Sequence, residues 1–475
     1  MREALTRVRD YLETHADRHL ARLRTLLRQP SVSVDGEGVE ACAALLVDLA
    51  KDAGFPEATV VPTPGYPGVW AAYDAGAPVT VAIYGMFDVR RAGGTWEHPP
   101  FEARVVPMPP FPRALVARGA RSVKGPLGVW LNAVEACRAV LGRPPVNLLL
   151  LAEGDEILGS PHYREMIARY RDRLRAARYA WTPGASQDAS GTAHLTLGYK
   201  GLIYMTVRAS GARWGRGPKQ GPIHGMARSV VDSPAWRLVH ALATLTGPDG
   251  NTPLIDGFDR PVGPPTPEEA AEVEALRSRF AGVPWQRVLP GVQGADVPAI
   301  NDAGEAEVYR RFFYGPSINI NGLRSGYVGP GTLTFTLPHV AEAVFDIRVP
   351  REWDVQAVLG AIRARLDAQG FSDVEMDVAG AFDGSRVSRD SPIVQAAEAL
   401  FSAHGHDIVW WPSTGGGGPW SIFAREFGMS VLRDVGLGHG RASATDEYLV
   451  IEGAGKVGGM VEMALSHAEF MLRLT

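Results

Sequence analysis

Residues 148–160, LLLLAEGDEILGS, form the stretch that decides the fold class. The stretch opens with an unbroken apolar run, which is typical of a strand buried on both faces of a sheet. This strand delivers two carboxylates, Asp155 and Glu156, to its end, directly before the apolar residues Ile157 and Leu158. Acidic side chains in such a position commonly bind a metal ion or transfer a proton. The sequence therefore predicts a functional site at the end of this strand.

Strands and helices alternate on both sides of this stretch. The sequence predicts strands over 79–89 and 145–154, and helices over 1–20, 124–141, 161–174, 391–405 and 453–474. Strands that are separated by helices favour an α/β fold with a doubly wound, parallel or mixed sheet. Such sheets bind ligands beyond the carboxyl ends of their strands. The acidic end of 148–160 lies where that rule places a site.

The pattern changes in the middle of the chain. Residues 202–211 and 331–349 alternate apolar and polar side chains, like strands of an antiparallel sheet with one solvated face. The sequence predicts helices between and after them, over 233–247, 266–282 and 354–370. We therefore predict one α/β domain formed by 1–203 and 385–475, interrupted by an inserted α+β domain over 204–384.

Composition excludes some classes of partner. The chain has 475 residues, 45% of them hydrophobic, and a formal net charge of -4. This mild acidity gives no electrostatic reason to expect nucleic acid or an anionic membrane as a partner. The two cysteines, Cys42 and Cys137, stand in apolar helical stretches, which fits a reducing compartment better than a disulfide framework. Without a predicted signal peptide or membrane span, we expect a cytoplasmic protein.

Eight short motifs follow one another along almost the whole chain. They are LRQPSVS (27–33), YGMFDV (84–89), WEHPPFEARV (96–105), ARGARSVKGPLG (117–128), EGDEILGSP (153–161), LTLGYKGL (195–202), a segment over 320–350 that ends in FDIRVP, and ASATDEYLVIEG (442–453). In this order they resemble the motifs of the zinc aminoacylase, carnosinase and carboxypeptidase-G family, metallopeptidase family M20. The resemblance implies a catalytic α/β domain with an inserted lid and dimerisation domain, and therefore a homodimer.

The resemblance also implies two zinc ions held by five ligands, but the matching positions carry other residues. Those positions are Met86, Ser122, Ile157, Gly184 and Ser443. Gly and Ile have no side-chain donor, a neutral Ser binds zinc poorly, and Met suits soft copper(I). We therefore expect no zinc cofactor of the conventional kind in this chain.

Residues that match the family but do not bind metal are retained. By resemblance, Asp88 supports the metal site, Glu156 is the general base and His224 in the lid stabilises an oxyanion. Arg348 would hold a substrate carboxylate, and the backbone of Gly415, Gly416 and Gly417 would bind the same end of the substrate. Each of these residues also has a purely structural interpretation, as a strand-end cap, a packing histidine, an ion pair or a flexible turn.

Arginines stand next to several of the vacated ligand positions. Arg121 precedes Ser122, Arg441 lies two residues before Ser443, and Arg90 closely follows Asp88. Guanidinium groups there would replace the missing positive charge and hold substrate oxygens, and Ser122 and Ser443 would also bind the substrate. Taken one at a time, each arginine is better interpreted as a solvated loop residue.

These residues predict a particular chemistry. Zinc lowers the pKa of bound water from about 15.7 to about 7, so loss of zinc should abolish or greatly slow ordinary peptide hydrolysis. Burial against Met86, Ile157 and Leu158 should instead raise the pKa of Glu156 and make it an acid–base group near neutral pH. We predict a metal-independent enzyme that isomerises, eliminates, cyclises or transfers an acyl group on a small amino-acid, N-acyl-amino-acid or dipeptide-like substrate.

Two alternatives stay open at this point. One is a homologue that binds such a ligand without any catalysis. The other is a metal-dependent dipeptidase or deacylase whose ligands are rearranged, using Asp88, Glu156, Asp446 and His439. Otherwise His439, like His162, is interpreted as a packing or surface histidine.

Overall fold

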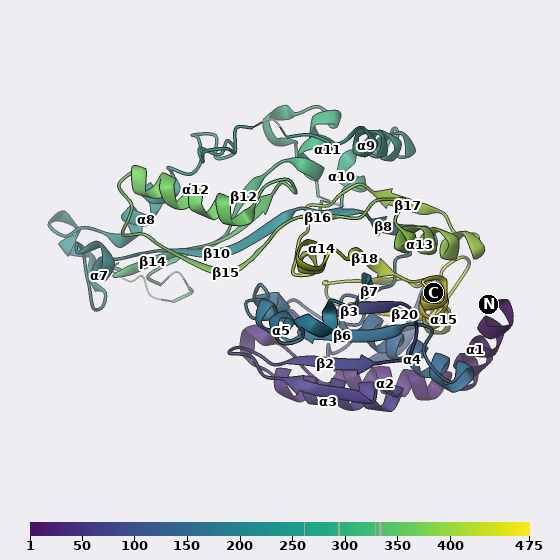
Figure 1. Ribbon diagram of the computed structural model, residues 1–475. Coiled ribbons are helices and arrows are strands. Elements are labelled where there is room, and N and C mark those ends of the chain that lie inside the picture. Colours follow the sequence, from purple (N-terminus) through teal and green to yellow (C-terminus); the bar gives the residue numbers. More distant parts are fainter. Residues whose placement is uncertain (261, 293–294, 328, 332–334) are drawn as a thin grey trace. The chain divides into compact units, whose positions relative to one another are not determined.

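The computed structural model describes residues 1–260, 262–292, 295–327, 329–331 and 335–475. They fold into two compact units (Figure 1). The first contains Met1–Leu197, Arg386–Trp411 and Pro419–Thr475, and the second contains Gly198–Ser385 and Pro412–Gly418. The predicted α/β fold with an inserted α+β segment is confirmed. The residue boundaries predicted for the two domains stay a prediction.

A six-stranded sheet forms the centre of the first unit. Its order is β1 (Glu57–Val61), β2 (Gly68–Tyr73), β6 (Asn147–Glu153), β3 (Thr80–Met86), β7 (Tyr179–Pro183) and β18 (Ser430–Val435). The last four strands are mutually parallel, whereas β1 and β2 pair antiparallel at one edge. The apolar run of β6 is buried from Leu148 to Glu153, and each of its leucines contributes about 2 kcal/mol through burial.

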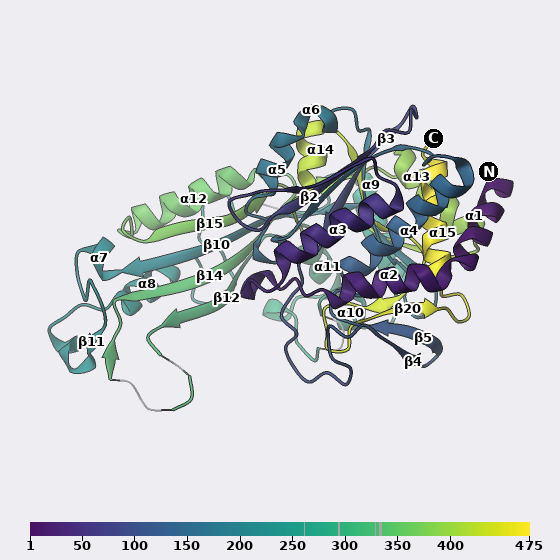
Figure 2. The same ribbon diagram turned by 90° about the horizontal axis from the view of Figure 1, so that it is seen from below.

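Helices cover both faces of this sheet. Figure 2 shows α2 (Ala16–Arg28), α3 (Val39–Ala53) and α4 (Lys124–Leu141) on one side, and α5 (Tyr163–Arg169) and α14 (Ser421–Phe427) on the other. The remaining long helices of the unit are α1 (Arg2–Thr14), α13 (Pro392–Ala403) and α15 (Met460–Arg473). The helix predicted over 1–20 is interrupted at His15, which separates α1 from α2. Cys42 and Cys137 are free and buried, as expected.

A smaller antiparallel sheet belongs to the same unit. Its order is β19 (Gly440–Arg441), β20 (Tyr448–Glu452), β5 (Phe111–Val116) and β4 (Arg104–Met108). The pairing of β20 with β5 joins residues that are more than three hundred positions apart in the chain. It brings the segment around Ser443 beside the segment around Ser122, two of the vacated ligand positions.

The second unit is built on a four-stranded antiparallel sheet. Its order is β12 (Ser317–Ser325), β14 (Val340–Val349), β10 (Gly201–Ser210) and β15 (Glu375–Phe382). Ala343, Phe345 and Ile347 of β14 are buried against a core that includes α8 (Pro234–Leu242) and α12 (Val355–Ala368), while Val344 between them is 43% exposed. This alternation confirms the predicted one-sided sheet. Residues 332–334 of the predicted strand lie outside the described residues.

The other elements are short or peripheral. In the first unit they are η1 (Ser33–Asp35), η2 (Glu156–Leu158), α6 (Arg171–Leu174), β8 (Ala193–Thr196) and β17 (Ile408–Trp411). In the second unit they are β9 (Gly198–Tyr199), α7 (Gly211–Trp214), β11 (Ile223–His224), η3 (Gly225–Ser229), α9 (Pro267–Arg279), α10 (Trp285–Val288), η4 (Ile300–Asp302), α11 (Glu305–Tyr314) and β13 (Thr336–Leu337); β16 (Ser385–Arg386) lies at the junction.

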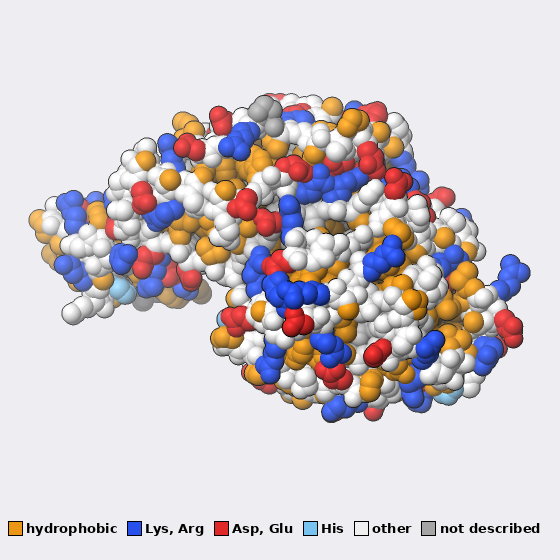
Figure 3. Space-filling view, viewed as in Figure 1, with side chains coloured by type: hydrophobic (Ala, Val, Ile, Leu, Met, Phe, Trp, Pro, Cys, Tyr) orange, Lys and Arg blue, Asp and Glu red, His pale blue; other side chains and the backbone are white. Residues whose placement is uncertain are grey.

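Charges on the surface are mixed. On the face shown in Figure 3, acidic and basic side chains are interspersed among polar and apolar ones on both units. Within the described residues, no helix combines the length and the apolar composition that crossing a membrane requires.

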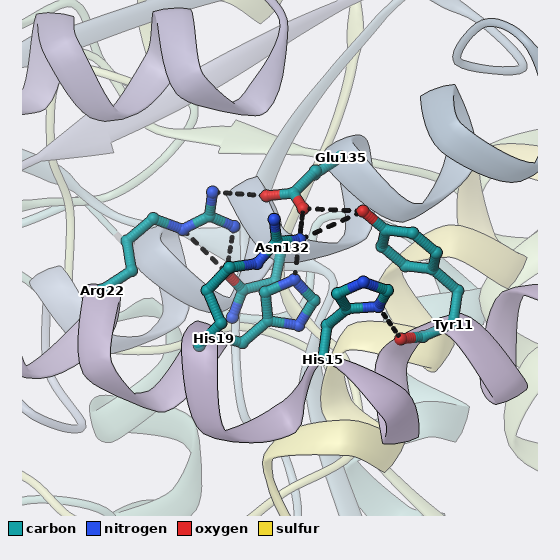
Figure 4. A network of polar contacts seen from close by, with 7 residues as sticks. Tyr11, His15, His19, Arg22, Asn132 and Glu135 are labelled. Atoms are coloured by element: carbon teal, nitrogen blue, oxygen red, sulfur yellow. Dashed lines mark hydrogen bonds and ion pairs between the residues drawn. The ribbon is translucent and has the colours of Figure 1, made fainter.

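A buried carboxylate ties the N-terminal helices to α4 (Figure 4). Glu135 of α4 is 4% exposed and receives hydrogen bonds or ion pairs from four side chains of α1 and α2. These are Tyr11 (2.9 Å), Arg18, Arg22 and His19 (3.5 Å). Burial alone would raise the pKa of Glu135, but the bonds and charges from His19 and Arg22 outweigh burial and lower the pKa to about 2.

Removal of this carboxylate should destabilise the first unit in a pH-dependent way. Glu135→Gln leaves buried donors without their charged partner, which costs about 3 kcal/mol at pH 7. Because the folded-state pKa lies below the ordinary value of 4.5, the stabilisation is complete above that value and is lost as the pH falls towards about 2. Urea unfolding of the variant should therefore differ from wild type strongly at pH 7 and much less at pH 3. Glu40→Gln, an exposed position on α3, should match wild type at both. Equal stability of Glu135→Gln and wild type at pH 7 would contradict this role.

Candidate functional site

The candidate site begins where two neighbouring parallel strands end. Met86, the last residue of β3, pairs with Glu153, the last residue of β6. The segments that follow these strands therefore emerge side by side at one edge of the sheet. Asp88 lies in the first segment, and Glu156 begins η2 in the second.

Asp88 fixes the position of the turn that carries Glu156. The side chain of Asp88 is fully buried and accepts hydrogen bonds from the backbone N–H groups of Glu156 (3.2 Å) and Ile157 (2.9 Å). The hydroxyl of Ser33 in η1 donates a third bond (2.7 Å). Burial and the neighbouring Glu156 charge raise the pKa of Asp88 to about 7. Asp88 thus acts on Glu156 through the backbone, a contact that the sequence did not predict, and its predicted catalytic role stays a prediction.

Glu156 faces a cavity of about 360 Å³ within the first unit. Four of the five vacated ligand positions line the same cavity: Met86, Ser122, Ile157 and Ser443. The fifth, Gly184, does not, and no side chain fits there, since a Cβ would lie 2.2 Å from the Cα of Asp434. The structure thus places around one cavity four of the five positions that the family resemblance assigns to metal ligands.

The environment of Glu156 shifts its pKa in the predicted direction. Burial raises the pKa of this carboxyl, and the positive charges of Arg433 and Arg90 oppose the rise without cancelling it. One part of the prediction is wrong: Leu158 is 38% exposed and does not line the cavity. Met86 and Ile157, both half-buried, are the apolar residues that do.

The two acids at the end of β6 have different positions. Only Glu156 lines the cavity, whereas Asp155 is buried outside it and burial raises its pKa to about 6. A third acid, Glu153, is fully buried and accepts a hydrogen bond from the hydroxyl of Tyr84 (2.7 Å). Sequence reasoning missed Glu153, because it stands inside the apolar run that forms the strand.

Three side chains of the kinds that bind zinc line the cavity: Glu156, His194 and Asp434. Within the described residues, no group of three or more His, Cys, Asp or Glu side chains is placed to hold a metal ion, and zinc requires at least three protein donors. The residues of the rearranged metal site, Asp88, Glu156, Asp446 and His439, do not all lie around one cavity. Asp446 accepts backbone hydrogen bonds from Glu97 and His98 (both 3.0 Å), and His439 Nδ1 bonds the carbonyl oxygen of Gln187 (2.9 Å). Neither residue lines the cavity.

Four arginines line the cavity: Arg90, Arg118, Arg121 and Arg433. Arg433, in the second half of β18, was not predicted, because its place at the edge of the same sheet depends on the pairing of β18 with β7. Arg441 was predicted near Ser443 but instead donates hydrogen bonds to the carbonyl oxygens of Thr445 (2.6 Å) and Asp446 (3.0 Å). It does not line the cavity and is exposed, but it belongs to the short strand β19 and not to a loop.

A buried acid organises the loop that carries Arg121 and Ser122. Glu447 is fully buried and forms an ion pair with Arg118 (3.0 Å). It also accepts hydrogen bonds from the backbone N–H groups of Arg121 (3.0 Å) and Ser122 (2.8 Å), and from the Ser122 hydroxyl (2.7 Å). Glu447 therefore neutralises the charge of Arg118, whereas the side chain of Arg121 lines the cavity. Asp434, His194 and Ser186 are further lining residues that sequence reasoning missed.

The other predicted site residues belong to the second unit. Arg348 donates to Asp346 (2.9 and 2.7 Å) and to the carbonyl oxygen of Gly415 (3.0 Å). Arg348, Gly415 and Gly416 line a cavity of about 1000 Å³ within that unit. Gly417 does not line it but must lack a side chain, since a Cβ would lie 2.4 Å from the carbonyl oxygen of Lys200.

His224 lies elsewhere in the second unit. It is exposed at the end of β11, and its Nδ1 accepts a hydrogen bond from the Met226 N–H (3.2 Å). The substrate-binding roles of Arg348 and the glycines, and the catalytic role of His224, stay predictions.

Comparisons with known proteins agree with this architecture. Residues 200–374 match the family model described as a peptidase dimerisation domain, M20_dimer. The Cys-Gly metallodipeptidase dug1 of Schizosaccharomyces pombe is 26% identical over 375 residues, which cover 75% of this chain and 74% of that protein. The Beta-Ala-His dipeptidase of Homo sapiens is 26% identical over 351 residues, which cover 73% of this chain and 60% of the human protein.

Solved structures extend the match to nearly the whole chain. An M20 family metallo-carboxypeptidase from Sulfolobus solfataricus superposes with a TM-score of 0.77 at 26% identity, covering 96% of this chain and 98% of that one. Human carnosine dipeptidase 1 shares the fold, with a TM-score of 0.74 at 22% identity and 99% coverage of both chains. The chain is thus similar to M20 peptidases over most of its length, shares their fold and matches the model of their dimerisation domain over residues 200–374.

Proposed function

We propose that this chain is an enzyme for small amino-acid-like or dipeptide-like substrates, with Glu156 as its proton-transferring group. The observation that carries the proposal is the placement of Glu156. Its carboxyl faces a small cavity, its backbone is held by the buried Asp88, and burial raises its pKa. The substrate class is supported by the relatives, which are named as dipeptidases for Cys-Gly and Beta-Ala-His.

The geometry suits proton transfer beside a developing negative charge. Glu156 takes a proton from a substrate atom or from a water molecule and returns it to a leaving atom or, in an isomerisation, to another atom of the substrate, so the carboxyl is unchanged after each cycle. General acid–base catalysis of this kind contributes about a hundred- to ten-thousandfold. The guanidinium groups of Arg121 and Arg433 line the same cavity and would stabilise an oxyanion, which adds a comparable factor of about a hundred or more. Isomerisation, elimination, cyclisation and acyl transfer are all reactions that this arrangement would serve.

A second candidate function is a metal-dependent dipeptidase or deacylase. It is favoured by the similarity to metallodipeptidases over about three quarters of the chain. It would require a rearrangement or further donors, because the three metal-binding side chains that line the cavity, Glu156, His194 and Asp434, are not placed as a group that could hold a metal ion in the described residues. A third candidate function is ligand binding without catalysis. A ligand would bind in the same cavity, and Glu156 would transfer no proton.

A homodimer is also part of the proposal. The match of residues 200–374 to the peptidase dimerisation domain supports it. So do exposed apolar side chains of the same segment, since large apolar residues on a surface commonly mark an interface. Trp236 on α8 is 56% exposed, and Leu323 on β12 is 58% exposed.

Metal analysis separates the first two candidates. The chain is purified from medium supplemented with zinc, and its metal content is measured by mass spectrometry. We expect clearly less than one zinc per chain. Turnover of a panel of dipeptides and N-acyl amino acids should be unaffected by a strong chelator. About two zinc ions per chain, together with loss of turnover on chelation, would instead establish the metal-dependent function.

Substitution of Glu156 tests the proton-transfer role. Glu156→Gln removes the transferable proton with almost no change of shape, so turnover should fall at least about a hundredfold while the fold and ligand binding remain. Glu165→Gln, an exposed acid on α5 that does not line the cavity, is the matched control and should be active. Wild-type turnover by Glu156→Gln would refute the assignment. A wild-type protein that binds members of the panel but converts none would establish the non-catalytic function.

A further inference from the structure

We infer that the cavity at Glu156 is a binding site for a compact oxyanion, a carboxylate or phosphate group of the ligand, held chiefly by Arg121 with Arg433 and Arg90. The inference deepens the proposed function, because it specifies a group that the substrate must carry. It also stands apart from catalysis, since an anion can bind whether or not Glu156 transfers a proton.

The side chains at the matched positions differ from the metal ligands that the family resemblance implies. Positions that the resemblance assigns to ligands of two divalent cations carry side chains that do not bind zinc, and the described residues offer no replacement set. The same cavity is lined by four guanidinium groups. A site that supplies its own positive charge repels a metal dication and attracts an anion.

The balance of charge in the cavity is positive. Arg118 is paired with the fully buried Glu447, so it adds no net charge. Arg433 forms an ion pair with Asp434 (3.9 Å), which leaves Arg90 and Arg121 and one further lining carboxylate, Glu156. An incoming anion would bring the site close to neutrality.

Arg121 has donors that no protein group uses. Within the part of the chain that the structure describes, no hydrogen bond or ion pair is formed by the side chain of Arg121, which is half-buried. The backbone at Arg121 is nevertheless held in place, because its N–H donates a hydrogen bond to Glu447 (3.0 Å). A guanidinium group offers five donors in a planar fork that matches the oxygens of a carboxylate or phosphate. An oxyanion in the cavity would supply the missing acceptors.

The start of α4 adds to the same field. Val123, the N-cap residue of this 18-residue helix, lines the cavity, and no side chain caps the helix there. The amino end of a helix carries a partial positive charge, which favours anions, although here the N–H of Gly125 already donates to the carbonyl oxygen of Gly119 (3.0 Å) and Pro126 has no N–H. The start of a helix does not by itself make a binding site, but its partial charge has the same sign as the charges of the arginines.

The size of the cavity limits the ligand. A volume of about 360 Å³ accommodates a small molecule with a compact anionic group, but not a long peptide. The ligand is therefore expected to carry a carboxylate or a phosphate directly next to the atom at which Glu156 acts.

Binding of simple anions to the full chain tests the inference. Calorimetric titrations with inorganic phosphate and with acetate are run at constant ionic strength, set with chloride. Wild type should bind at least one of the two at one site per chain. Arg121→Gln should weaken that binding about tenfold or more, because it removes a charge-assisted hydrogen-bond donor. Arg113→Gln, an exposed arginine on β5 away from the cavity, should bind like wild type.

A second pair of variants keeps the test decisive. Should Arg121→Gln fail to fold, Arg90→Gln, at an exposed position, should fold and weaken binding several-fold. Glu156→Gln should bind the anion more tightly than wild type, because it removes a like charge from the cavity. The two probes are also compared with each other in wild type. If phosphate binds more tightly than acetate, the ligand carries a phosphate group; if acetate binds more tightly, the ligand carries a carboxylate.

Two results would overturn the inference: no binding of either probe, or equal weakening by Arg121→Gln and Arg113→Gln. The outcome is independent of turnover. Unchanged turnover by Glu156→Gln with anion binding intact would refute only the proposed proton transfer.

Discussion

The buried carboxylate of Asp88 is the group on which the candidate site depends. It lies at the end of β3 and accepts the backbone N–H groups of Glu156 and Ile157, which follow the neighbouring strand β6. These bonds fix the direction of a turn whose sequence has no other strong structural signal. Ser33 supplies a third bond from a segment fifty-five residues away. Without this anchor, the turn that carries Glu156 would be held only by its own backbone hydrogen bonds.

Charge decides what such a cavity accepts. In a site with two dications, acidic and imidazole ligands surround a positive centre that the protein does not itself provide. Here the chain provides the positive charge from Arg121, Arg433 and Arg90, while Glu447 neutralises Arg118 and holds the loop. The burial that raises the pKa of Glu156 also strengthens every interaction with these guanidinium groups. Proton transfer beside a bound oxyanion is the chemistry that these features share.

Local patterns were sufficient to predict most of the fold but only part of the site. The apolar run before Asp155 predicted β6, and the motif order predicted that Ser122, Ile157 and Ser443 would meet, as they do in one cavity. Arg433 could not be found, because its place depends on the pairing of β18 with β7 across some two hundred and fifty residues. Arg441 was misplaced for the opposite reason, since its closeness in sequence to Ser443 says nothing about the direction of its side chain. The antiparallel strands β1 and β2 also escaped prediction, because both are short and one is largely exposed.

The most direct test of the central claim is a crystal structure of the chain grown with both zinc and phosphate, with anomalous diffraction recorded at the zinc edge. The account predicts an anion against the guanidinium of Arg121 and no zinc peak within bonding distance of the residues that line the cavity. Two strong zinc peaks there, about 3.5–4 Å apart, would contradict it and would show a working dimetal centre.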